Sequence, residues 1–275
     1  MRPFGLVLTA LLLARLPARA QQTPAAPPAA PPAQDKVLDE HLRKWERAMK
    51  DVTSLGAQIL RTDKDVTWDQ VQTLSGEAYY LKSGTGPTAL NLALLELRAT
   101  EGKKEMREKF ICTGTFIYQF LPDRKEIRYY ELPKPKSGQV AEDNLLSLLF
   151  GMKADEAKSR YNLKLTKEDQ HYVYVEIAPR NAADKSDFQR ARMVLNKTNY
   201  LPRQLWFEHA NGNEVTWNIP NLQTNMKLER RYFDAPKEPP GWKMVAGETR
   251  PQPHTVRPAS PSAPSAPAPA KPAGR

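Results

Sequence analysis

The chain has 275 residues, with 41 Lys and Arg, 31 Asp and Glu, 25 Pro and a single Cys. One cysteine excludes a disulfide-stabilised scaffold. A multipass membrane protein is also excluded, because the sequence lacks a series of long apolar runs. The formal charge of +10 would suit a nucleic-acid-binding protein, but 34 of the basic and 30 of the acidic residues lie between residues 35 and 245. Because that region is nearly balanced in charge, we expect no nucleic-acid partner.

Residues 1–20 have the features of a secretory signal peptide. Arg2 gives a positively charged start, residues 4–13 form an apolar run, and Ala18-Arg19-Ala20 fits the small-x-small rule for cleavage. The run is too short to span a bilayer. We therefore expect a periplasmic or secreted protein whose mature chain begins near residue 21 and has no transmembrane segment.

Two proline-rich segments flank the centre of the chain. Residues 21–34 are rich in Pro and Ala, and residues 246–275 in Pro, Ala and Ser. Proline fixes φ and lacks an N–H donor, so we expect a disordered linker and a disordered tail without a core. The basic residues of the tail are too dispersed for a polybasic switch, and peripheral membrane contact stays an open question. One domain is expected over residues 35–245.

This domain is predicted to begin with an amphipathic helix. Apolar residues recur at spacings of four and three on one helical face, namely Leu38, Leu42, Trp45, Met49 and Val52. Acid–base pairs four residues apart support the helix on its other faces. Asp35 is the predicted N-cap.

Alternating apolar residues then predict strands, separated by turns rich in Gly, Pro, Asp and Lys. The segments are residues 56–61, 76–83, 90–99, 107–120, 125–132, 171–177, 189–197, 202–209 and 214–219. Their lengths and order predict an antiparallel meander. Segment 90–99 (LNLALLELRA) is apolar on both faces, so it is either buried on both or lines a cavity on one.

Alternation also predicts which side chains share a face. One apolar inner face is expected from residues of equal parity, namely Phe110, Cys112, Phe116, Tyr118 and Phe120. Asn211-Gly212 is typical of a two-residue hairpin turn. With these two residues at its centre, Trp206 would lie opposite Trp217 and stabilise the hairpin.

A helical insert is predicted in the middle of the domain. Residues 143–150 (DNLLSLLF) are apolar nearly all round, with Gly151 placed to end the helix, and residues 154–161 form a second, polar-faced turn. A helix that is apolar on all sides needs cover on all sides. Two interpretations stay open: a plug packed into the core, or a lid over an apolar pocket.

The residues offer no catalytic or metal-binding pattern. The four His are far apart, and none stands with Cys or acidic residues at metal-ligand spacing, so we expect no metal and no cofactor. The single Cys112 lies in an apolar segment and is interpreted as a small hydrophobic residue. Phosphate-binding, dinucleotide-binding, zinc-protease and nucleophile-elbow motifs are missing from the sequence. A catalytic triad can still assemble from scattered residues, but we rank a hydrolase last and expect a non-enzymatic protein.

Three stretches resemble the LolA-type lipoprotein carrier superfamily. They are EKFICTGTFIYQFLPDRKEIRYYEL, YLPRQLWFEHANGNEVTWNIPNLQTN and RRYFDAPKEPPGWKMV. The second is similar to a P-x-x-L-x-F … G-N-x-V-T-x-x-F pattern, with Ile219 at the last position, where an aromatic residue is common. MKADEAKSRYNLKLTKED and the following HYVYVEIAP resemble a branch of exported planctomycete proteins.

The resemblance implies an α+β fold over residues 35–245: an antiparallel, highly curved, unclosed β-barrel, with an N-terminal helix and a central helical insert on its concave side. It further implies a carrier or sensor that binds a lipid or lipoprotein acyl chain without catalysis. In such carriers an arginine latches the lid, and this sequence offers four candidates: Arg61, Arg98, Arg107 and Arg128.

The predicted ligand-binding residues are those expected to line the cavity and its lid, namely Leu42, Trp45, Leu92, Leu94, Phe116, Tyr118, Leu145, Leu146, Leu149 and Phe150. The alternative function is a structural or protein-interaction module of the cell envelope. In that case the barrel is plugged, the proline-rich segments are tethers, and another envelope protein is the partner.

Overall fold

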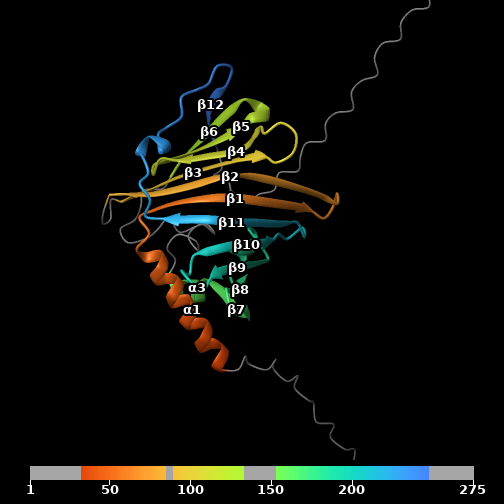
Figure 1. Cartoon of the computed structure of the whole chain (residues 1–275). Helices are drawn as coiled ribbons and strands as arrows, with labels where there is room; N and C mark the ends of the chain where they lie inside the picture. The colour runs from red at the N-terminus through yellow and green to blue at the C-terminus, as the bar shows by residue number, and fades with distance from the viewer. Residues whose placement is uncertain (1–31, 85–88, 133–152, 248–275) are drawn as a thin grey trace, which may run out of the picture. The chain divides into compact units, whose positions relative to one another are not determined.

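The computed structural model describes residues 32–84, 89–132 and 153–247. A twelve-stranded, unclosed sheet dominates this part of the chain (Figure 1). Its strands are β1 (Ser54–Asp65), β2 (Gln70–Ser83), β3 (Leu90–Ala99), β4 (Met106–Cys112), β5 (Phe116–Leu121), β6 (Glu126–Glu131), β7 (Tyr161–Glu168), β8 (Tyr172–Pro179), β9 (Arg190–Asn196), β10 (Pro202–Glu208), β11 (Glu214–Thr224) and β12 (Lys243–Ala246).

The strand order across the sheet is β12-β6-β5-β4-β3-β2-β1-β11-β10-β9-β8-β7. Two antiparallel meanders, β1–β6 and β7–β11, therefore meet where β1 pairs with β11. The predicted α+β half-barrel is confirmed. Strand β7 was not predicted. Alternation did not indicate β12 either, whose four residues pair in parallel with β6, but the resemblance of RRYFDAPKEPPGWKMV implied a terminal strand there.

The helices are α1 (Pro32–Lys50), α3 (Ala154–Arg160) and the short α4 (Ala182–Lys185), with 3-10 turns η2 (Pro122–Arg124) and η3 (Arg230–Phe233). Helix α1 confirms the amphipathic prediction but begins three residues before the expected N-cap, so Asp35 lies in its first turn instead. Proline is tolerated there because the first N–H groups of a helix have no intrahelical partner. Helix α3 confirms the second part of the insert, whereas residues 143–150 lie outside the described residues.

Helix α1 packs on one side of the sheet, which we call the inward face. All five residues of its predicted apolar stripe are buried, and Trp45 has no exposed surface. They join a large core cluster with α3 and with inward side chains of β1–β3 and β7–β11. Each large aliphatic side chain buried in this way stabilises the fold by about 1.5–3 kcal/mol.

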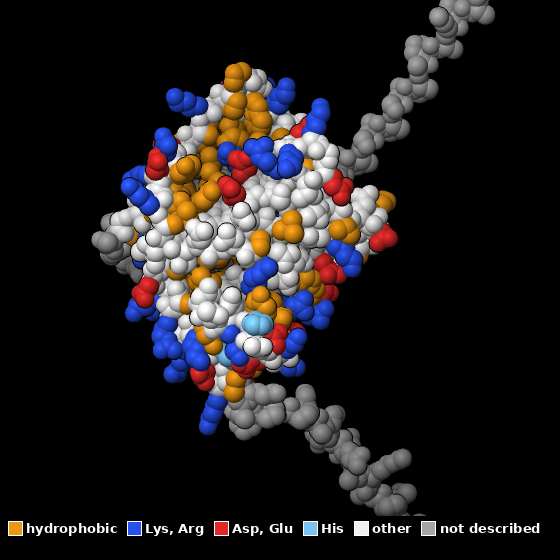
Figure 2. Space-filling model, in the orientation of Figure 1, with side chains coloured by type: hydrophobic (Ala, Val, Ile, Leu, Met, Phe, Trp, Pro, Cys, Tyr) orange, Lys and Arg blue, Asp and Glu red, His pale blue; other side chains and the backbone are white. Residues whose placement is uncertain are grey.

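A second core cluster lies on the opposite, outward face of the sheet. Ile111, Phe120 and Ile127 form it, and Trp242 and Met244 from the C-terminal segment cover it. That segment leaves β11, passes η3 and ends as β12 beside β6 (Figure 1). Figure 2 shows hydrophobic side chains gathered over the region of β4–β6 and β12, with Lys and Arg around them.

Strand β3 confirms the prediction that both its faces are apolar. Leu92 is 1% exposed and Leu97 is fully buried, and they project to opposite faces. The predicted common face of residues 110–120 is wrong. The turn at residues 113–115 places Ile111 opposite Tyr118, so an odd-numbered residue of β4 shares its face with an even-numbered residue of β5.

In consequence, Phe110 and Cys112 of β4 face inward, whereas Phe116, Tyr118 and Phe120 of β5 face outward. The residue between two outward side chains of β5, Ile117, faces inward opposite Cys112. One hairpin therefore supplies apolar side chains to both faces of the sheet.

The predicted register of the β10–β11 hairpin is wrong by one residue. Trp206 lies opposite Thr216, and Trp217 lies opposite Leu205. The turn is longer than expected because the Gly212 N–H donates to the His209 C=O at 2.9 Å, while the His209 N–H donates to the Asn213 C=O at 2.9 Å. Gly212 adopts a left-handed φ of +82°, as a hairpin loop with one additional residue requires.

Candidate functional site

The inward face has two parts. One is packed against α1, and the other carries apolar side chains that are mostly outside the core clusters of the described residues. Under α1 the packing is complete: Leu42 and Trp45, both predicted ligand-binding residues, are 1% and 0% exposed within the large core cluster. The structure therefore places these two residues in the protein core.

Beyond α1, strands β3–β5 present a continuous inward apolar surface. Strand pairing places Ala93 beside Cys112, Leu95 beside Phe110, and Cys112 beside Ile117. All five side chains are half-buried. Leu95 contacts the large core cluster, but neither core cluster of the described residues includes the other four. We call these five residues the inward apolar patch.

A buried ionic cluster lies at one end of this patch. Arg61 of β1 is 3% exposed, and it donates from Nε to Asp63 Oδ1 at 2.7 Å and from Nη1 to Glu108 Oε2 at 2.6 Å. Its guanidinium also lies 5.0 Å from the centre of the Trp217 ring. Of the four arginines considered for a lid latch, Arg61 is the buried one.

The opposite charges in this cluster stabilise each other's ionised forms. Burial raises the pKa of Glu108, against the opposing effect of Arg61. Burial also acts against the charge of Arg61, but the two carboxylates outweigh it and raise the pKa of Arg61. Glu108 Oε1 is buried and has no hydrogen-bond partner among the described residues. Arg61 is therefore the main source of stabilisation for the Glu108 carboxylate.

The contact between Arg61 and Glu108 requires a strongly bent sheet, because β2 and β3 lie between their strands. The bend is visible at Gly76 of β2. A Cβ atom on this glycine would lie 1.8 Å from the Glu96 carbonyl oxygen of β3. Only glycine permits so close an approach of two backbones.

Tyr80 borders the other side of the inward apolar patch, where it pairs with Ala93. Its hydroxyl donates to Asn91 Oδ1 at 2.8 Å, and burial raises its pKa to about 12. The phenol therefore stays protonated and neutral throughout the physiological range.

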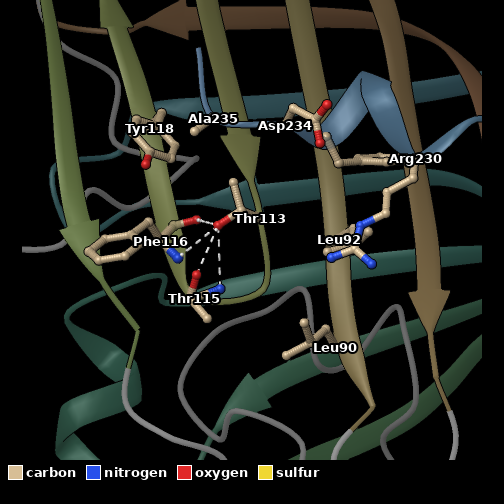
Figure 3. Close-up of a pocket in the computed structure, with 10 residues that line it drawn as sticks. Leu90, Leu92, Thr113, Thr115, Phe116, Tyr118, Arg230, Asp234 and Ala235 are labelled. Carbon is tan, nitrogen blue, oxygen red and sulfur yellow. Dashed lines mark hydrogen bonds between the residues drawn. The ribbon is translucent and has the colours of Figure 1, made fainter. Parts of the chain in front are cut away.

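A pocket of about 330 Å³ lies on the outward face (Figure 3). We call it the outward pocket; it is lined by Leu90, Leu92, Thr113, Thr115, Phe116, Tyr118, Arg230, Phe233, Asp234 and Ala235. Three predicted ligand-binding residues, Leu92, Phe116 and Tyr118, come together here. A fourth, Leu94, packs against the neighbouring outward core cluster.

The remaining predicted residues, Leu145, Leu146, Leu149 and Phe150, lie outside the described residues. Sequence reasoning missed Ile117 of the inward apolar patch, because its place depends on the β4–β5 register. It also missed Arg230 and Phe233. Only the short RRYF sequence, two bases followed by two aromatics ahead of several prolines, could have drawn attention to them.

The described residues contain neither a metal-binding cluster nor a membrane-spanning helix. Over residues 32–84, 89–132 and 153–247, no three His, Cys, Asp or Glu side chains are grouped so that they could hold a metal ion. No helix in those ranges has the length and apolar character needed to cross a membrane.

A protein-family model described as "Outer membrane lipoprotein carrier protein LolA" matches residues 103–236. This region runs from just before β4 to just after η3 and includes α3. No curated protein matches the sequence. The resemblance predicted from the sequence is confirmed for the fold.

Several solved structures are similar to this chain at low identity. An uncharacterized conserved protein from Thermus thermophilus is 10% identical, with 77% of this chain and 99% of that chain covered and a TM-score of 0.46. A putative outer membrane lipoprotein-sorting protein domain from Vibrio parahaemolyticus is 13% identical, with 71% and 95% covered and a TM-score of 0.39. The Mycobacterium tuberculosis lipoprotein LppX is 12% identical, with 71% and 98% covered and a TM-score of 0.37.

Proposed function

We propose that this chain, which has a LolA-type lipoprotein carrier fold, is a non-enzymatic exported carrier or sensor that holds an acyl chain of a lipid or lipoprotein against the inward apolar patch. The observation that carries the proposal is the patch itself. Its side chains are apolar and half-buried, yet four of the five belong to neither core cluster of the described residues.

An acyl chain suits this surface physically. Burial of each methylene contributes about 0.8 kcal/mol, and the patch extends over three neighbouring strands. Phe110 and Ile117 give it a broad apolar floor, and Tyr80 at its border stays uncharged. Since α1 and α3 cover another part of the inward face, the ligand is expected to be a single chain or a few chains.

A second function is favoured by the packing under α1. Trp45 and Leu42 plug that part of the inward face completely, as a structural or protein-interaction module would require. In this alternative, protein rather than lipid covers the inward apolar patch. Native mass spectrometry of the full-length protein separates the two functions, because a carrier retains acyl-chain mass and a plugged module does not.

The decisive variant is Ile117→Glu, which places a charge on the β5 side of the patch. Gln58→Glu is its matched control, because it adds the same charge at an exposed position of β1. Binding of a fluorescent undecanoate to the full chain should fall at least about tenfold for Ile117→Glu and stay unchanged for Gln58→Glu. Equal binding by both variants would contradict the proposal.

A second variant guards against misfolding of Ile117→Glu. Ala93→Phe adds bulk to the patch without adding a charge, and Ala93 is half-buried, so the fold has room to accommodate the ring. Its unfolding transition, followed by circular dichroism, should resemble that of the unmodified chain. Retention of full undecanoate binding by a folded Ala93→Phe would place the ligand elsewhere.

A further inference from the structure

The outward pocket lies on the face of the sheet opposite the inward apolar patch, so it does not belong to the site proposed above. Its volume of about 330 Å³ falls within the range of about 300–1,000 Å³ that is usual for small-molecule pockets. Strand β3, the β4–β5 turn, strand β5 and the η3 region all contribute to it. Figure 3 shows their side chains directed into one shared space.

Part of the lining of the outward pocket is apolar and packed against neighbouring side chains. Leu92 and Phe233 are 1% and 2% exposed, so they form its floor. The rings of Phe116 and Tyr118 lie 6.3 Å apart, and both contact Tyr129, at 6.1 and 6.4 Å respectively. Packed rings lose little conformational entropy when they contact a ligand, which makes them suitable binding groups.

Arg230 brings a positive charge to the outward pocket, whose lining also includes Thr113, Thr115 and the carboxylate of Asp234. The side chain of Arg230 extends over Leu92, and the carboxylate of Asp234 points away from its guanidinium (Figure 3). No ion pair joins Arg230 to any carboxylate in the described part of the chain. The neighbouring Arg231, in contrast, pairs with Glu229 at 2.7 Å.

We propose that the outward pocket binds a small carboxylate with an apolar tail. The tail lies against Leu92, Phe116, Tyr118 and Phe233, and the carboxylate accepts hydrogen bonds from Arg230. A guanidinium matches a carboxylate because its donors form a planar fork that can make two parallel hydrogen bonds. A neutral or cationic compound with the same tail gains nothing from this group.

The test uses the full chain and three probes that share one tail: decanoate, decanol and decyltrimethylammonium. Binding is measured by calorimetry for the unmodified chain and for Arg230→Gln, with Arg231→Gln as the matched control. Decanoate should bind about tenfold more weakly to Arg230→Gln, as expected for loss of a charge-assisted pair, and equally well to Arg231→Gln. Decanol binding should be the same for all three proteins.

Two outcomes would overturn the proposal: equal effects of Arg230→Gln and Arg231→Gln on decanoate, or decanol and decyltrimethylammonium binding as tightly as decanoate. Ala235→Trp adds a further test, because a large ring at this exposed lining position should block the pocket and abolish the Arg230-dependent component. Ile117→Glu keeps the two sites distinct. It should weaken the part of undecanoate binding that does not depend on Arg230 and leave the Arg230-dependent binding of decanoate unchanged.

Discussion

The buried cluster of Arg61, Asp63 and Glu108 supports a quantitative prediction about stability. In Arg61→Met, a side chain of similar length and flexibility loses its charge, and two carboxylates remain close together without their cation. Removal of one partner from a buried ion pair costs about 3–5 kcal/mol, because an uncompensated charge is left inside the protein. Since a domain is typically stable by about 5–15 kcal/mol, this substitution should remove a large fraction of the total.

Arg98→Met is the matched control. Arg98 also contacts a carboxylate, at 2.5 Å from Glu96, but its side chain is 51% exposed. Exposed ion pairs contribute about 0–1 kcal/mol, since water and salt screen them. Urea unfolding at pH 8, followed by circular dichroism, should therefore show a loss for Arg61→Met several times that for Arg98→Met.

The same reasoning fixes the sign of the pH dependence. The pKa of Glu108 is already raised by burial, and loss of Arg61 removes the group that opposes this shift. The folded variant then binds more protons than the unfolded chain at pH values above the ordinary pKa of a carboxyl group. Its stability must therefore increase as the pH falls toward that ordinary value, and the deficit measured at pH 8 should be smaller at pH 5.

Adding Glu108→Gln to Arg61→Met should recover part of the loss, because a neutral amide replaces one of the two buried carboxylates. Two results would refute the reasoning about this cluster. One is a stability loss for Arg61→Met no larger than that for Arg98→Met. The other is a deficit that does not change between pH 8 and pH 5.

Further substitutions test other features of the fold. Gly76→Ala should lower the melting temperature markedly in calorimetry, because its Cβ would lie 1.8 Å from the Glu96 carbonyl oxygen and force β2 and β3 apart; an unchanged melting temperature would argue against the bend. Trp45→Ala should cost about 3–5 kcal/mol in urea unfolding, as expected for a fully buried ring, yet leave decanoate binding in the outward pocket intact. Burial raises the pKa of Tyr80 and Tyr161 to about 12, so an ultraviolet titration should find both phenols protonated near pH 11 in the folded chain. Because unfolded tyrosines ionise near pH 10, the stability contributed by these two residues is lost as the pH rises from about 10 to 12.

The features predicted correctly from the sequence were set by local periodicity. The apolar stripe of α1 depends only on the 3.6-residue repeat, and its five residues are all buried. The double-faced character of β3 could be predicted in the same way, because alternation within one strand assigns each side chain to a face. Both predictions need no knowledge of which strand lies next to which.

The errors concern positions that turns determine. Phe110 and Phe116 were predicted to share a face. The turn between β4 and β5 instead pairs odd-numbered residues of one strand with even-numbered residues of the other, so the two side chains lie on opposite faces. The same kind of error misplaced Trp206 and Trp217 by one residue. A one-residue change in a turn moves every side chain of the following strand to the other face, and no alternation within the strand reveals it.

The separation of the two proposed sites depends on this same geometry. Ile117 faces the inward apolar patch, while Phe116 and Tyr118 on either side of it face the outward pocket. Helix α1 and the C-terminal segment cover other parts of these faces, so β5 contributes to two apolar surfaces that are only partly covered by the described residues. Substitutions one residue apart therefore act on different sites. Phe116→Asp should weaken the Arg230-dependent part of decanoate binding and spare the part that does not depend on Arg230, Ile117→Glu should do the reverse, and loss of both parts in either variant would mean that the two sites are one.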